Sequence, residues 1–379
     1  MENPLLELQE YENLQEALKK AKGPVQATGT LDSQKVHLMY WLGKDGGFPW
    51  KLVVTYDDQR AREIYDDFRS FTENVWLYPA KDLLFYSADI HGNLMTRQRI
   101  AVWRHLMEEE EGVVVTTLDG LMDHLLPLVF LKQQAVTVEN GQIMDLDEWK
   151  ERLTALGYER TAQVDGMGQF SIRGGIVDIF PLTEEVPVRI ELWDDEVDSI
   201  RSFDPESQRS VEQLEKITIY PSAETILTKK QLEAGIERLE KEEKEYEAAL
   251  RAKHQIEEAS RIRGIIKELT EGIRQGWKRD GLDAYIRYFC PETVSFLDYF
   301  PAGDTLICLD EPARLKEKGE TVEQEFRESM IHRLEKGYLL PGQTELLYAG
   351  AQVLAKLQSP YTVMLTGLDQ KLPDRKSVV

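Results

Sequence analysis

Three short apolar runs, rich in β-branched residues and separated by segments long enough for a helix, constrain the fold of this chain most strongly. They are residues 51–56 (KLVVTY), 74–78 (NVWLY) and 112–117 (GVVVTT). A strand that is apolar along its whole length is typical of a parallel sheet, in which helices cover both faces. The apolar spacing in residues 59–71 predicts one such helix, and residues 97–107 predict another. We therefore expect residues 1–145 to form the first part of an α/β domain.

The pattern changes to short strands separated by turns over residues 146–222. In the run VRIELW the apolar residues alternate with three others: Val188, Ile190 and Leu192 against Arg189, Glu191 and Trp193. This period of two predicts an antiparallel sheet with one buried face and one polar face. We expect a small inserted α+β domain at this place.

The third segment, residues 223–379, begins with a long helical pattern. Residues 225–278 have apolar positions at three-, four- and seven-residue spacings amid dense Glu and Lys, which predicts a long helix with solvated charged faces. After Gly281 the α/β pattern returns. Residues 305–309 predict a strand that rejoins the first sheet.

The charge of the chain limits the kind of partner that it can hold. There are 46 Lys and Arg residues against 68 Asp and Glu residues, so the formal net charge is -22 and the pI is near 4.8. Most non-specific affinity for nucleic acid comes from lysine and arginine side chains that neutralise phosphates. Such an acidic chain is therefore poorly suited to binding DNA over a broad surface. We expect weak DNA binding and a protein partner.

Cysteine usage and hydropathy indicate the compartment. Cys290 and Cys308 have no companion Cys or His at metal-ligand spacing, so we expect neither a metal site nor a disulfide framework. The first residues lack the basic start of a signal peptide, and no apolar run is long enough to span a membrane. These features fit a cytoplasmic protein without membrane contact. The histidines form no catalytic pair, and we predict no catalytic residue and no cofactor.

Residues 27–38 (ATGTLDSQKVHL) lie near the start of the α/β domain, where a nucleotide-binding P-loop would lie. A P-loop, Gly-x-x-x-x-Gly-Lys-Ser/Thr, binds phosphates with backbone N–H groups and a lysine, and its hydroxyl holds magnesium. Here no Gly-Lys-Ser/Thr follows Gly29, and Asp32 and Gln34 place a carboxylate and an amide where positive charge is required. We interpret the segment as a strand-to-helix turn with Asp32 or Ser33 as the N-cap.

The apolar run LICLDE ends in a pair of acids, Asp310 and Glu311, as the companion motif of a P-loop does. In an ATPase the first acid would organise magnesium and the second would activate water. Without a phosphate-binding lysine, we interpret the pair as structural or vestigial. The residues of this degenerate nucleotide site are then Gly29, Asp32, Ser33, Asp310 and Glu311.

The densest signal lies in residues 157–221. Gly174 and Gly175 favour a tight turn between two strands, and Arg173 would be presented just before that turn. Arg160 ends the helical stretch that leads into the sheet. We expect antiparallel pairing in the small sheet to bring the two arginines onto one face.

Aromatic residues accompany these arginines. An arginine with an adjacent ring is a common interface anchor, because the guanidinium pairs with carboxylates while the ring fills a pocket. Phe170 and Phe180 are the candidates for that ring. The residues alone also allow the other interpretation, in which both phenylalanines belong to the core and both arginines form surface ion pairs.

Four runs in this region carry a family resemblance: Tyr-x-Arg at 158–160, Gly-x-Phe-x-x-Arg-Gly at 168–174, Asp-Ile-Phe-Pro at 178–181, and Arg-Ile-Glu through Asp-Ser-Ile-Arg-x-Phe-Asp-Pro at 189–205. They resemble the inserted second domain of the UvrB and transcription-repair coupling factor (Mfd) lineage. Residues 281–301 are similar to the segment before the Asp-Glu box of UvrB. The resemblance covers nearly the whole chain and is strongest over residues 112–311.

The resemblance implies a degenerate, helicase-like parallel-sheet domain that carries the inserted domain. UvrB has an intact P-loop and a tyrosine-rich hairpin that clamps DNA, whereas residues 78–100 here pass from strand to helix without that hairpin. Both losses resemble the amino-terminal region of the coupling factor. In that family an RNA-polymerase-binding domain and an ATP-driven translocase of double-stranded DNA come later in the chain. Neither follows Val379, so we expect a fragment of a longer protein.

In the family, the positions matching Arg160 and Arg173 contribute to binding of the repair protein UvrA, and a third arginine of UvrB corresponds to Ser171 here. The resemblance implies a module that recruits UvrA to stalled RNA polymerase without an ATPase of its own, with Phe170 and Phe180 as further contact residues. Two alternatives stay open. One is an active UvrB-like ATPase that binds damaged DNA, and the other is an intramolecular clamp that contacts the carboxy-terminal region and restrains the translocase motor.

Overall fold

The computed structural model describes residues 3–20, 22–81, 92–108, 110–276 and 281–367. The chain divides into two compact units. The first unit comprises Met1–Ala88, Glu108–His124 and Val294–Val379, and the second comprises Asp89–Met107 and Leu125–Thr293. The predicted lack of a hairpin within residues 78–100 falls mainly on residues 82–91, which lie outside the described part of the chain.

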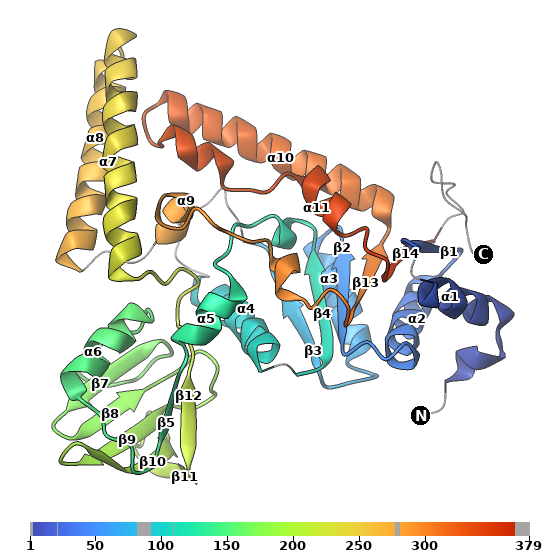
Figure 1. Ribbon diagram of the computed structural model, residues 1–379, viewed down its shortest axis with the longest axis horizontal. Coiled ribbons are helices and arrows are strands. Elements are labelled where there is room, and N and C mark those ends of the chain that lie inside the picture. The colour runs from blue at the N-terminus through green and yellow to red at the C-terminus, as the bar shows by residue number, and fades with distance from the viewer. Residues whose placement is uncertain (1–2, 21, 82–91, 109, 277–280, 368–379) are drawn as a thin grey trace. The chain divides into compact units, whose positions relative to one another are not determined.

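A six-stranded parallel sheet forms the centre of the first unit, with the strand order β1-β14-β13-β2-β4-β3 (Figure 1). Its strands are β1 (Val25–Thr28), β2 (Trp50–Thr55), β3 (Val75–Tyr78), β4 (Gly112–Thr117), β13 (Thr305–Asp310) and β14 (Thr362–Thr366). The helices of this unit are α1 (Gln9–Lys19), α2 (Asp32–Asp45), α3 (Asp58–Phe68), α10 (Pro312–Glu335) and α11 (Gly350–Lys356), with short 3-10 turns at Pro4–Glu7, Asp119–Leu121, Phe296–Tyr299 and Pro341–Glu345. The predicted α/β class is confirmed.

The predicted strands lie where their apolar runs place them. Strands β4 and β13 are buried at every position, as expected of strands covered on both faces. Helices α1, α2 and α3 bury their apolar residues in one core with these strands. Strand β13 pairs with β2 and with β14, so the chain does return to its first sheet.

The second unit contains a six-stranded sheet with the order β11-β10-β9-β8-β7-β6 and a separate two-stranded pair, β12 and β5 (Figure 1). The strands are β5 (Val136–Glu139), β6 (Glu159–Arg160), β7 (Gln169–Arg173), β8 (Ile176–Ile179), β9 (Val188–Trp193), β10 (Glu196–Phe203), β11 (Ser210–Leu214) and β12 (Lys216–Ile219). The helices are α4 (Gly92–Met107), α5 (Leu128–Gln134), α6 (Leu146–Ala155), α7 (Lys229–Ala252), α8 (Ile256–Gln275) and α9 (Ile286–Phe289), with a 3-10 turn at Leu282–Tyr285.

The small sheet has the predicted alternation. Val188 and Ile190 are buried and Leu192 is half-buried, whereas Arg189 and Glu191 are partly exposed and Trp193 is exposed. Strands β6 to β11 are antiparallel apart from one pair: β6 and β7 are parallel. One face of this sheet therefore belongs to the core, and the other presents polar side chains.

The long helix expected over residues 225–278 is wrong as a single element. Two helices, α7 and α8, occupy this segment and lie side by side (Figure 1). They are separated at His254, which has a φ of 61°, in the left-handed region that ends a right-handed helix. The chain reverses direction there, so that α7 and α8 pack against each other. Each helix thereby buries residues of its apolar face.

Candidate functional site

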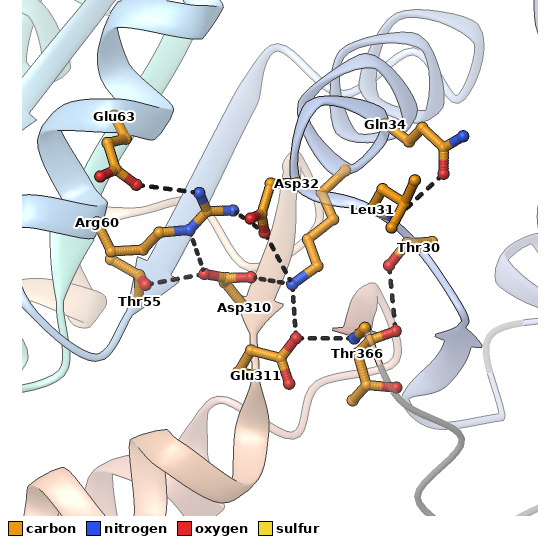
Figure 2. Close-up of polar contacts among 12 residues, drawn as sticks. Thr30, Leu31, Asp32, Gln34, Thr55, Arg60, Glu63, Asp310, Glu311 and Thr366 are labelled. Carbon is orange, nitrogen blue, oxygen red and sulfur yellow. Dashed lines mark hydrogen bonds and ion pairs between the residues drawn. The ribbon is translucent and has the colours of Figure 1, made fainter.

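The residues predicted to form a degenerate nucleotide site lie where β1 leads into α2 and at the end of β13 (Figure 2). Gly29 directly follows β1 and has a φ of 72°, a conformation that favours glycine. Helix α2 begins at Asp32, and its N-cap is Leu31, whose N–H donates to Gln34 Oε1 at 3.1 Å. The expected N-cap at Asp32 or Ser33 is therefore wrong, because both residues are already helical and Gln34 supplies the acceptor.

Lys35 occupies the position of the P-loop lysine, which corrects the interpretation that no such lysine exists. Counted from Gly29, Gln34 stands at the second glycine, Lys35 at the lysine and Val36 at the Ser/Thr of the motif. The spacing between Gly29 and Lys35 is the sequence feature from which this lysine could have been identified. Compared with a P-loop, the segment lacks the second glycine and the hydroxyl but has the lysine.

Two carboxylates hold this cation inside the protein. Lys35 Nζ lies 2.7 Å from Asp310 Oδ1 and 2.7 Å from Glu311 Oε1, and the Lys35 side chain is 1% exposed. Glu311 has a φ of 52°, which turns it back from the strand end, and its Oε1 also accepts the Gly367 N–H at 2.7 Å. The predicted Asp-Glu pair is thus joined to the lysine of the degraded loop (Figure 2).

Arg60, on α3, completes the network and was not recognised from the sequence. Its Nε donates to Asp310 Oδ2 at 3.1 Å, and its Nη2 donates to Asp32 Oδ1 at 2.8 Å. Thr55 Oγ1 also donates to Asp310 Oδ2, at 3.0 Å. Its burial could have been inferred from the sequence, because Arg60 stands four residues before Ile64 and so lies on the same, buried face of the helix.

The charges of this network are compensated internally. Burial alone lowers the pKa of Lys35, but the hydrogen bonds and charges of Asp310 and Glu311 outweigh burial, so the pKa is raised. For Arg60, too, burial acts to lower the pKa, and the charge and hydrogen bond of Asp310 raise it overall. Both side chains therefore stay protonated and paired with carboxylates. A phosphate would have to displace carboxylates from Lys35 to reach it.

A second candidate site lies on the small sheet, where Arg160 and Arg173 line the same open hollow of about 470 Å³. Its other lining residues are Thr161, Ala162, Ser171 and Ile172. Strand β6 pairs with β7 in parallel, with Arg160 opposite Phe170. The antiparallel pairing expected for these arginines is thus wrong. Parallel pairing of a two-residue edge strand brings Arg160 beside β7 instead.

The two arginines are presented differently. Arg160 is exposed on the edge strand. Arg173 precedes the predicted turn at Gly174 and Gly175, and its Nη2 lies 2.8 Å from Asp178 Oδ2. Asp178 is 1% exposed and is also bound by Arg189 through contacts of 2.6 and 2.9 Å. The guanidinium of Arg173 is therefore held in place at the rim of the hollow.

Ser171 and the two phenylalanines lie inside the small domain. Ser171 is 1% exposed and donates from Oγ to the Ala162 carbonyl at 3.0 Å, which joins two lining segments of the hollow. Phe170 is 0% exposed and Phe180 is 7% exposed. Neither ring can fill a pocket on a partner in this conformation. We therefore correct their expected contact role and assign both to the core.

Comparison with known proteins connects these features to a family. The family model for the UvrB interaction domain matches residues 136–224, which include the hollow. The transcription-repair-coupling factor of Bacillus subtilis (strain 168) is 33% identical over 311 residues, 82% of this chain and 26% of the relative. The chain is thus similar to transcription-repair-coupling factors over about four fifths of its length. Those of Staphylococcus haemolyticus (strain JCSC1435) and Staphylococcus aureus (strain MRSA252) are 30% and 31% identical, each over 80% of this chain and 26% of the relative.

This chain spans about a quarter of the length of these coupling factors. The match to the UvrB interaction domain lies within the second unit, and the similarity to the coupling factors extends over most of the chain. A membrane-spanning helix is not found within the described residues.

Proposed function

We propose that this chain recruits UvrA, and that the hollow between Arg160 and Arg173 is the contact site. The observation that carries the proposal is that these two arginines, 13 residues apart in sequence, line one open hollow within the matched interaction domain. Arginine pairs with carboxylates in a bidentate manner, so the complementary surface on UvrA would be acidic. In the whole protein, contacts with stalled RNA polymerase and double-stranded DNA would belong to other segments.

The fixed position of Arg173 favours this role. A guanidinium that is already held by Asp178 loses little conformational freedom when it binds a partner. Its side chain is still 48% exposed, so it remains accessible. Arg160 adds an exposed cation on the other side of the hollow. Together they would select a surface with two acidic groups.

The proposal includes no ATPase activity for this chain. Lys35 is bound by Asp310 and Glu311, and the hydroxyl that would hold magnesium is replaced by Val36. The acid pair therefore stabilises the fold in place of a metal-nucleotide complex.

The test measures binding of purified UvrA to the immobilised chain by biolayer interferometry. We expect Arg160→Ala and Arg173→Ala each to weaken binding by about 2 kcal/mol or more, mainly through faster dissociation. Arg209→Ala is the matched control, because Arg209 is an exposed arginine of the same small domain that does not line the hollow. Equal affinity of the wild type and both hollow variants would place the contact site elsewhere.

A further inference from the structure

Trp193 is the exposed aromatic residue of the small sheet. It ends β9 and is 82% exposed. Among the other tryptophans that the structure describes, Trp76 is half-buried and the rest are buried: Trp41, Trp50, Trp103 and Trp149. Burying a large aromatic side chain releases much of its hydration, so an indole left in water has a large unused capacity for contact.

The strand register places Trp193 beside the turn that follows Arg173. The Leu192 N–H donates to the Gly175 carbonyl at 2.7 Å, so the end of β9 lies against the two-glycine turn. A Cβ at Gly175 would meet the Leu192 carbonyl at 3.0 Å, which shows how close the approach is. Strand β8 connects the two sites, because Ile176 pairs with both Arg173 and Glu191.

Pairing also determines which face of the sheet carries the indole. Directly paired residues share a face, and so do residues two apart on one strand. Arg173, Ile176 and Glu191 form one paired row, and Trp193 stands two residues beyond Glu191. Trp193 and Arg173 therefore belong to the same face of the sheet, opposite the face that buries Ile190.

A second exposed apolar residue continues the patch. Trp193 pairs with Glu196 of β10, and Glu196 also forms a bridge with Ile143, which is 63% exposed. Trp193 and Ile143 thus flank one glutamate in a single cross-strand row. Together they offer a partner exposed apolar surface to bury on this row of the sheet.

The charges around the indole point to the complementary chemistry. Asp194, Asp195 and Glu196 follow Trp193 directly, and all three are exposed. Within the described residues they have no ion pair with a lysine or arginine, whereas the nearby Glu191 pairs with Arg201. An uncompensated acidic cluster around an exposed ring is complementary to an apolar pocket with a cationic rim.

We propose that Trp193 is the aromatic anchor of the UvrA-binding face, with its indole in an apolar pocket of UvrA whose rim supplies lysine or arginine to Asp194, Asp195 and Glu196. This inference rests on the proposed function. It gives the binding surface two charge requirements: an acidic group for Arg173, and a basic one at the β9–β10 turn. A partner with both in the right order would bind in one orientation.

The experiment measures the affinity of purified UvrA for the whole chain and for four variants. Trp193→Ala should weaken binding about thirtyfold or more, and Trp193→Phe should retain most of the affinity because a ring still fills the pocket. Asp194→Asn with Asp195→Asn should slow association and reduce its dependence on salt. Val211→Ala is the control, because Val211 is 63% exposed on β11, at the other edge of the sheet from β6, and should bind like the wild type.

The outcomes separate this inference from the proposal on which it rests. If Trp193→Ala binds UvrA like the wild type while Arg160→Ala does not, the indole is no anchor and the recruitment function stands. If the wild-type chain does not bind UvrA, both fail together. Circular dichroism and thermal unfolding of each variant should match the wild type, because Trp193 is a surface residue.

Discussion

Replacing Lys35 by Met should destabilise the first compact unit by about 3–5 kcal/mol. Lys35 Nζ is 2.7 Å from both Asp310 Oδ1 and Glu311 Oε1, and the side chain is 1% exposed. Methionine nearly fills the same space but leaves Asp310, which is 0% exposed, with the contacts of Arg60 and Thr55. A buried charge that loses one partner is costly because water cannot replace that partner. Since Arg60 remains, we expect the lower half of the range.

Urea unfolding monitored by circular dichroism measures this loss. Lys51→Met is the matched control, because Lys51 is a half-buried lysine of the same sheet whose Nζ donates to the Pro49 carbonyl at 3.3 Å. Lys51→Met should cost less than about 1 kcal/mol. Adding Asp310→Asn to Lys35→Met should recover part of the loss, because the uncompensated charge is removed. If Lys35→Met costs no more than the control, the network does not stabilise the fold.

Three further outcomes are expected. Isothermal titration should show no micromolar binding of ATP, and heat of binding in that range would mean that the carboxylates release Lys35. Phe180→Ala should lower the free energy of unfolding by about 3–5 kcal/mol in a melt, while the folded variant keeps its affinity for UvrA; the reverse result would return the ring to the interface. Burial raises the pKa of Cys308 from 9.0 to about 12, and the pKa of Lys35 is also raised. Both groups bind more protons when folded, so stability should fall as pH rises above about 9, and Cys308→Ala should fall less steeply.

Strands β2, β3, β4 and β13 of the parallel sheet could be predicted from the sequence because each is a local apolar run, whereas β1 and β14 were not predicted. The run GVVVTT is rich in β-branched residues and buried throughout, and β4 has the bounds of that run. The pairing between Lys35 and Asp310 could not be predicted in the same way. These residues are 275 positions apart, and no local pattern shows that α2 and the end of β13 meet. The helix break at His254 was also missed, because the apolar spacing continues on both sides of it.

The candidate site was predicted in part. The two-glycine turn gave the position of Arg173, because its requirement for glycine is a local property. The alternation in QFSIR places Phe170 and Ile172 on one face of the strand, but an apolar residue at that place can belong to the core or to an interface, and only the structure shows that Phe170 is buried. Trp193 stood on the polar side of the alternating run VRIELW, so its exposure was implied by the pattern. Its position beside Arg173 depends on how β8 joins β7 and β9, which only the pairing register reveals.

The most direct test of the recruitment function measures the affinity of UvrA for the wild-type chain and for the double variant Arg160→Ala with Arg173→Ala. Asp178 keeps its contacts with Arg189 in this variant, so its thermal unfolding should stay close to that of the wild type. With both cations of the hollow removed, the account predicts that the dissociation constant rises about a hundredfold or more. A folded double variant that binds UvrA as tightly as the wild type would contradict it.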